Sequence, residues 1–350
     1  MAEHAVHLQK TSTRSLSPLS PTLVTIPIVL VKSVLGGVSS RGEACYPYLA
    51  DAGIAPELLD QPAARVTADQ YAALMRSLME RLGDEALGFL SRRLKHGTFL
   101  LMARAALGAP DLEHAIRRVA HTFELVQDDV SLELVRDRDL AGVALRFTEP
   151  DARPIFIDEL LMRVFWRLFA WLTGGRLPAA RFDFALACPP YVASYARAFP
   201  ASLNFEREQS AFWFDAAQLR APIRQNEATL RMFIAGMPAN ILVPRRGPRT
   251  TGARVIAHLQ ETVPGWPDLV ATADALHMSG STLQRRLAAE GTSFQALKDE
   301  LRRDMAIVRL ATGTVPVTDL ALELGFSDGA VFQRAFKSWT GCTPGQYRRP

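Results

Sequence analysis

Apolar residues recur at helical spacing along the C-terminal end of the chain. In residues 317–349 (VTDLALELGFSDGAVFQRAFKSWTGCTPGQYRR), the first apolar residues recur on one helical face, and Gly325 comes directly after the last of them. Glycine readily adopts the left-handed conformation that ends a helix. Ser327 is a good N-cap for a following helix, and Asp328 complements the positive end of its dipole. The pattern predicts a helix, a tight turn and a second helix.

The second of these helices, residues 328–338, carries two different faces. Its apolar side chains face inward, and its outer face carries small, amide and cationic residues: Gly329, Ala330, Gln333, Arg334 and Lys337. Such a row suits a groove of DNA. A helix-turn-helix joins its two helices by a short turn and places the second in the major groove. The alternative is an ordinary helical hairpin.

A second copy of this layout lies upstream, in residues 268–294. Ser281 or Thr282 is expected to begin its second helix, residues 281–289, whose outer face carries Ser281, Gln284, Arg285 and Arg286. Between the copies, residues 297–310 have helical periodicity and can form a rigid strut. Two helices held in this way would meet successive major grooves about 34 Å apart.

Three stretches, LQRRLAAEGTSF, LALELGFSD and FQRAFKSWTGCTPGQYR, resemble the DNA-binding domain of the AraC/XylS family of bacterial transcription regulators. The resemblance implies an all-α domain with two helix-turn-helix motifs over residues 253–350. It also implies base-reading residues at Ser281, Gln284, Arg285, Gly329, Ala330, Gln333 and Arg334. Gly329 and Ala330 are smaller than the residues common in the family, which favours backbone docking there. Cationic side chains expected to contact phosphate are Arg286, Arg302, Arg303 and Lys337.

The preceding residues, 33–242, mix helical and strand patterns. Helices are expected at residues 46–59, 68–82, 112–126, 155–172 and 189–199, with Thr67 as a cap for the second. Strands are expected at residues 130–136, 142–148, 182–186, 203–205 and 211–214, the first two forming a hairpin. The fold class is therefore an α+β N-terminal sensor domain joined to an all-α C-terminal domain.

The order LADAGIAPELLD, RVTADQYAAL, RLGDEALGF in this region resembles the N-terminal domain of one AraC/XylS subgroup, which is called arabinose-binding-like. This resemblance implies a regulatory, effector-binding domain that can also form a homodimer. Apolar walls with a few polar anchors suit a small molecule. The candidate pocket residues are Phe99, Arg104, Arg163, Trp166, Arg167 and Trp213, although core packing or surface exposure also accounts for each.

Charge and composition distinguish the C-terminal part, the linker and the leader. All of its net charge of +4 lies in residues 244–350, which hold 14 basic and 10 acidic side chains, as suits a phosphate-binding module. Residues 243–252 (VPRRGPRTTG) read as the interdomain linker, and residues 1–32 as a disordered or partly extended leader. No spanning helix or signal peptide is recognised, so we expect a cytoplasmic protein.

The sequence gives no catalytic constellation, cofactor motif or metal site. Cys45, Cys188 and Cys342 have no ligand-like spacing, and His114 and His121 are two helical turns apart. A tethered enzyme would need Cys188 beside a histidine and an acid. We expect an effector-responsive activator that contacts double-stranded DNA and RNA polymerase. The alternative is a ligand-independent regulator whose N-terminal domain is a protein-interaction module.

Overall fold

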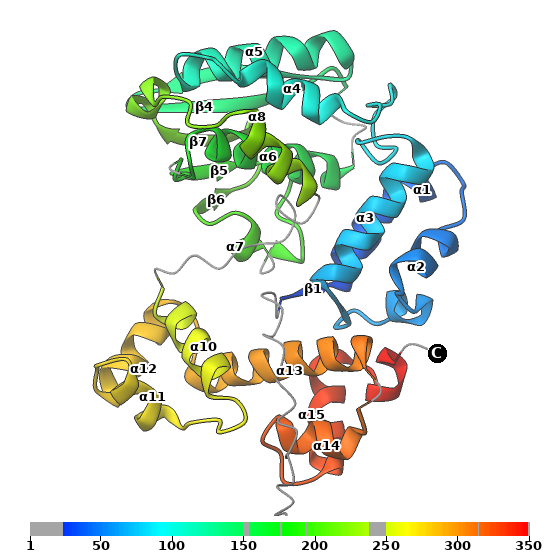
Figure 1. Cartoon of the computed structure of the whole chain (residues 1–350), viewed down its shortest axis with the longest axis vertical. Coiled ribbons are helices and arrows are strands. Elements are labelled where there is room, and N and C mark those ends of the chain that lie inside the picture. The colour runs from blue at the N-terminus through cyan, green and yellow to red at the C-terminus, as the bar shows by residue number, and fades with distance from the viewer. Residues whose placement is uncertain are drawn as a thin grey trace, which may run out of the picture.

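The computed structural model describes residues 24–149, 154–175, 177–192, 195–237, 250–313 and 315–348. Its N-terminal part combines helices with two sheets, and its C-terminal part is helical (Figure 1). The expected fold class, an α+β domain joined to an all-α domain, is confirmed. Residues 1–23 of the expected leader and 243–249 of the expected linker lie outside the described residues.

The larger sheet has the strand order β3-β4-β7-β5-β6, and only its β5 and β6 are parallel neighbours. Its strands are β3 (Val130–Asp137), β4 (Leu140–Phe147), β5 (Arg181–Asp183), β6 (Ser202–Asn204) and β7 (Ser210–Asp215). The expected hairpin is confirmed, because Val130 pairs with Phe147 and Asp137 pairs with Leu140. Arg138 and Asp139, between the two strands, form its turn.

Helix α6 (Ile155–Leu172) is the centre of this part of the molecule, as its dense apolar sequence predicts. The other helices around the sheet are α4 (Thr98–Ala106), α5 (Leu112–Val126), α7 (Tyr195–Ala198), η4 (Ala216–Arg220) and α8 (Glu227–Ala235). Phe165 of α6 meets Phe123 of α5 edge to face at 5.2 Å between ring centroids. Phe169 lies 6.3 Å from Phe212 of β7, so α6 is packed between α5 and the sheet.

A second group of elements precedes the sheet: β1 (Thr25–Pro27), α1 (Ile28–Ser39), α2 (Tyr46–Ala52), η1 (Pro56–Asp60), β2 (Arg65–Thr67) and α3 (Ala68–Leu82). Strands β1 and β2 form a two-stranded antiparallel ribbon. The expected leader boundary at residue 32 is therefore wrong. Helix α1 begins at Ile28 and buries Val31, Val34 and Leu35 at i, i+3 and i+4 spacing, so residues 24–32 belong to the fold.

Two expected helices are shorter in the structure. The helix expected at residues 46–59 ends at Ala52 because Gly53 is left-handed (φ 61°), and a 3-10 turn follows in η1. Within residues 189–199, the described helix is α7, while residues 193–194 lie outside the described residues. The cap at Thr67 is confirmed. Its hydroxyl accepts the N–H of Gln70, and the Gln70 side chain accepts the N–H of Thr67.

The C-terminal part consists of α10 (Thr251–Thr262), α11 (Leu269–Ala275), α12 (Gly280–Ala289), α13 (Phe294–Thr312), α14 (Val317–Glu323), α15 (Gly329–Thr340) and η5 (Pro344–Tyr347). Figure 1 shows α13 running from the group of α10, α11 and α12 toward α14 and α15. It also runs beneath the ribbon of β1 and β2, and the expected strut is therefore present. Within the ranges described above, no helix combines the length and apolarity needed to cross a membrane.

Candidate functional site

The first helix-turn-helix unit pairs α11 with α12. Helix α12 begins at Gly280 with Ser279 as N-cap, whose hydroxyl accepts the N–H of Thr282 at 3.2 Å. The expected beginning at Ser281 or Thr282 is thus one or two residues late. Leu283 and Leu287 are fully buried against the rest of the unit. The opposite face of α12 is left for solvent.

The second unit pairs α14 with α15. Gly325 is left-handed (φ 74°), and a Cβ there would lie 2.7 Å from Cδ1 of Trp266, so both conformation and space require glycine. Helix α15 is capped by Asp328, whose carboxylate accepts the N–H groups of Ala330 and Val331. The prediction of Ser327 as the cap is wrong by one residue. An aspartate caps as well as a serine does, and the sequence alone did not separate the two.

Both helices present an outer row of polar side chains. Six of these side chains are exposed: Gln284, Arg285, Arg286, Gln333, Arg334 and Lys337. Among the described residues, no hydrogen bond or ion pair holds any of these six side chains. Ser281 is exposed next to Ser279, Ala330 is exposed, and Gly329 is half-buried. The two faces are therefore available to an external partner.

Arg302 and Arg303, expected to contact phosphate, are instead held by partners within the protein. The guanidinium of Arg302 lies 4.9 Å from the ring centroid of Trp266 and 5.0 Å from that of Phe326, and its side chain is 13% exposed. Burial lowers the pKa of Arg302. Arg303 pairs with the buried carboxylate of Asp304 at 2.9 Å. Both arginines contribute to packing around α13.

Trp266 joins the two units to each other. It lies in the loop between α10 and α11, and its indole N–H donates to the carbonyl of Glu323 in α14 at 2.9 Å. Its own carbonyl accepts from Nζ of Lys298 on α13 at 3.0 Å. The Arg302 guanidinium fills the space between Trp266 and Phe326. The relative orientation of α12 and α15 is therefore fixed by side chains as well as by α13.

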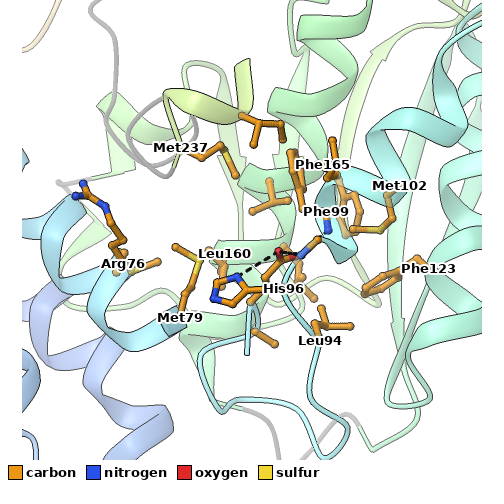
Figure 2. A pocket seen from close by; sticks show the side chains of 18 residues that line it. Arg76, Met79, Leu94, His96, Phe99, Met102, Phe123, Leu160, Phe165 and Met237 are labelled. Atoms are coloured by element: carbon orange, nitrogen blue, oxygen red, sulfur yellow. Dashed lines mark hydrogen bonds and ion pairs between the residues drawn. The ribbon is translucent and has the colours of Figure 1, made fainter. Parts of the chain in front are cut away.

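An apolar cavity of about 300 Å³ lies in the N-terminal part, between α3, α4, α6 and the end of α8 (Figure 2). Four methionines contribute flexible walls: Met75, Met79, Met102 and Met237. Methionine adapts to ligands of different shape because it is unbranched and polarisable. Its aromatic wall is formed by Phe99, Phe123 and Phe165. The size and lining suit a small apolar molecule.

The polar end of the cavity is formed by Glu85 and His96. The carboxylate of Glu85 accepts the N–H of Gly97 at 2.8 Å and of Phe99 at 2.7 Å, which fixes it at the start of α4. Burial raises the pKa of Glu85, although these two N–H groups oppose that rise. His96 Nδ1 lies 4.0 Å from Glu85 Oε1, and Figure 2 shows the imidazole among the cavity side chains. Arg76 extends away from them.

Of the expected pocket residues, only Phe99 lines this cavity. Trp166 donates its N–H to the carbonyl of Leu177, and Arg167 lies over its ring. Trp213 packs beneath Arg181, and Arg163 lies over Phe199. Arg104 forms an exposed ion pair with Glu227. The other five side chains therefore lie outside this cavity, and the sequence does not show which aromatic and cationic side chains already have partners.

Sequence reasoning missed Glu85, His96 and the methionines. Glu85 and His96 form no motif of characteristic spacing, so the sequence carried no signal that would have placed them at one site. Across the described parts of the chain, no group of three or more metal-binding side chains comes together. Cys188 is an exposed free thiol whose sulfur lies 3.9 Å from the carbonyl oxygen of Pro189, so the constellation required for the tethered enzyme is not formed among the described residues.

Comparisons with known proteins agree with this architecture. Residues 42–223 match the family model of the arabinose-binding N-terminal domain of AraC transcription regulators, and residues 272–350 match a helix-turn-helix domain. The ornithine utilization regulator of Pseudomonas aeruginosa is 30% identical over 95% of this chain and 98% of its own. The urease operon transcriptional activator of Escherichia coli is 36% identical over 27% of this chain and 32% of its own.

Among solved structures, the transcriptional regulator CdpR from Pseudomonas aeruginosa is 20% identical and spans 91% of this chain and 98% of its own. Its TM-score with this chain is 0.32. The matched families and relatives are transcription regulators rather than enzymes. Since the N-terminal family model covers more than half of the chain, this DNA-binding protein belongs to the AraC family of transcription regulators.

Proposed function

We propose that this regulator is an effector-responsive activator that reads two successive major grooves of its operator with α12 and α15. The observation that carries the proposal is the pair of exposed, uncommitted polar rows on two helices whose orientation is fixed by α13 and Trp266. A rigid pair of reading helices can engage two grooves without a further ordering cost.

The two rows divide naturally into base-reading and phosphate-binding residues. Gln284 and Gln333 can each bond adenine in two places, and Arg285 and Arg334 can do the same with guanine. Ser281 lies at the exposed start of α12 and would read bases there. Gly329 and Ala330 are small, so the start of α15 would approach the DNA with its backbone.

Two further side chains would position the protein on the duplex. Arg286 and Lys337 lie on the exposed faces of α12 and α15, where cations can bind phosphate at any sequence. Arg302 and Arg303 are omitted from this set because their partners are internal.

The apolar cavity is the proposed effector site. Its walls favour an apolar body, and the carboxylate of Glu85 favours a ligand end that donates a hydrogen bond, such as an amine or hydroxyl, over a carboxylate. The name of the ornithine relative adds one specific candidate to test. The cavity supports an effector over the alternative of a fully packed, ligand-independent interaction module.

Activation would require contact with RNA polymerase, and a homodimer would present two such proteins at one promoter. The urease operon activator matches the DNA-binding end of this chain, and its name supports activation over repression. The protein would act in the cytoplasm, where bacterial promoters lie.

The test starts from a random duplex library selected with the full-length protein. We expect an enriched site with two conserved segments one helical turn apart, and a promoter fusion carrying that site should lose expression when the gene is deleted. A single enriched segment would contradict reading by two helices, and increased expression on deletion would contradict activation. A site with a single enriched segment would contradict reading by two helices but would not bear on the proposed effector site.

A further inference from the structure

Four polar side chains join the two parts of the chain at a buried contact, which we call the ribbon joint: Thr25, Arg65, Asp304 and Tyr347. The hydroxyl of Thr25 on β1 donates to Oδ1 of Asp304 on α13 at 2.7 Å. Nε of Arg65 on β2 donates to the same hydroxyl at 2.6 Å. The backbone N–H of Arg65 donates to the Tyr347 hydroxyl in η5 at 3.0 Å. Each domain thus supplies partners for the other.

The ribbon joint is more specific than ordinary apolar packing. Thr25, Asp304 and Tyr347 are 1%, 0% and 7% exposed. A buried polar group that loses its partner keeps its desolvation cost without compensation, so these contacts tolerate little sliding of one domain over the other. Burial raises the pKa of Tyr347 to about 12, so its hydroxyl keeps its proton at neutral pH.

From the ribbon joint, contacts lead directly to the second reading helix. The ring of Tyr347 meets the ring of Phe336 edge to face, with centroids 5.2 Å apart and planes at 86°. Phe336 is the fully buried anchor of α15, the helix whose outer face carries Gln333 and Arg334. Asp304 lies on α13, and Oδ1 is also held by Arg303. The ribbon therefore contacts both α13 and Tyr347 of η5, and Tyr347 packs directly on α15.

In the other direction, the ribbon joint is continuous with the N-terminal domain. Strand β2 ends at Thr67, which caps α3 through a reciprocal pair of hydrogen bonds with Gln70. Further along the same helix, Met75 and Met79 line the apolar cavity. A tilt of α3 would therefore move the ribbon, because no flexible segment separates them.

We propose that Thr25 and Tyr347 are positioning residues for DNA recognition: through the ribbon joint, the N-terminal domain holds the second reading helix in the orientation that specific binding requires. This assigns a role in sequence discrimination to residues that face no groove. The proposed role does not depend on an effector, because it can be measured with the full-length protein in the absence of any ligand.

The test compares Thr25→Val and Tyr347→Phe in the full-length protein. Valine keeps the shape of threonine without its hydroxyl, and phenylalanine keeps the ring that packs on Phe336. The matched control is Thr173→Val. Thr173 is equally buried, at 1% exposed, but among the described residues its hydroxyl bonds only to the carbonyls of Phe169 and Ala170 in α6, the helix that it follows. Affinities are measured for the duplex selected by the wild-type protein and for a scrambled duplex, after active protein is titrated.

We expect each joint variant to lower the ratio of specific to non-specific affinity by roughly fivefold, the value of one net hydrogen bond, with non-specific affinity unchanged. A variant that only unfolds would lower both affinities together, and the melting temperature and active fraction identify that case. The other variant then still decides the question. The proposal is overturned if the ratio is unchanged in folded variants, if specific binding tightens, or if Thr173→Val has the same effect.

Discussion

The carboxylate of Asp328 accepts the backbone N–H of Val331 at 2.8 Å, and the same oxygen accepts the N–H of Ala330 at 2.8 Å. This cap starts the second reading helix. We predict that Asp328→Ala lowers both the melting temperature and the affinity for the selected duplex, because the first turn of α15 frays. Asp328→Asn should retain most of both, since asparagine is also a good N-cap. Equal losses in the two variants would contradict a capping role.

The same carboxylate gives a pH dependence. The N–H of Val331 is the main cause that holds the pKa of Asp328 below its ordinary value of 3.8. A lowered pKa in the folded state means that the ionised group contributes stability above about pH 4, which is lost as the pH falls through the folded value. The wild type should therefore melt higher than Asp328→Asn at pH 7, and the difference should shrink as the pH falls below 3.8. The difference should shrink with salt because Asp328 is exposed. A constant difference from pH 7 to pH 3 would contradict this account.

Arg302 should behave as a packing residue. We predict that Arg302→Lys lowers the free energy of unfolding by about 1–2 kcal/mol, because an ammonium does not replace a planar guanidinium between Trp266 and Phe326. Denaturant unfolding measures that loss. Arg302→Ala, which unlike Arg302→Lys removes the positive charge, should leave the slope of the salt dependence of DNA affinity unchanged. A decrease in slope by about 1 would instead indicate a lost phosphate contact.

The outer face of α12 allows base reading to be separated from phosphate binding. Arg285→Ala should cost about 1–3 kcal/mol of discrimination at one base pair and relax the selected sequence there. Arg286→Ala on the same helix should weaken all duplexes about equally and reduce the salt slope by about 1. Affinity measured across single-base variants at several salt concentrations checks both. Uniform weakening by Arg285→Ala would place that side chain on the backbone instead.

The cavity prediction concerns ligand-induced stabilisation. A panel of octylamine, octanol, octanoate and ornithine is scanned by thermal melting, in which a ligand at 100 times its Kd adds about 2.7 kcal/mol. We expect the amine or alcohol to raise the midpoint more than octanoate does, because Glu85 disfavours a second carboxylate.

A cavity-filling variant tests the location. Val164→Phe should abolish the shift, because Val164 lines the cavity. The control is Val135→Phe, which alters a partly buried valine of β3 that does not line it. An equal shift in wild type and Val164→Phe would place the ligand elsewhere.

Local sequence patterns predicted those parts of the fold that depend on interactions between residues close together in the sequence. Helix α3 runs between Thr67, a reciprocal cap, and Gly83, a left-handed stop, so both ends are written in the sequence. Helix α6 has the length and position that its apolar run predicts. Both outer rows of the reading helices followed from spacing alone.

The sequence failed where a distant partner decides the outcome. The role of Arg302 depends on two rings, Trp266 and Phe326, that lie far from it along the chain. Glu85 faces the cavity only because α3, α4 and α6 converge there. In the same way, Ile28 looked like part of a leader because the elements that cover α1 are remote in sequence.

Strand β1 has a consequence for the modularity of this protein. The N-terminal family model begins at residue 42, whereas the fold begins at least as early as Thr25, which pairs with Thr67 across the ribbon. A chimera exchanged at residue 42 would combine the ribbon strand and α1 of one regulator with the partner surfaces of another. The exchangeable unit is therefore longer than the shared sequence, and a transplant should include the residues that precede the match.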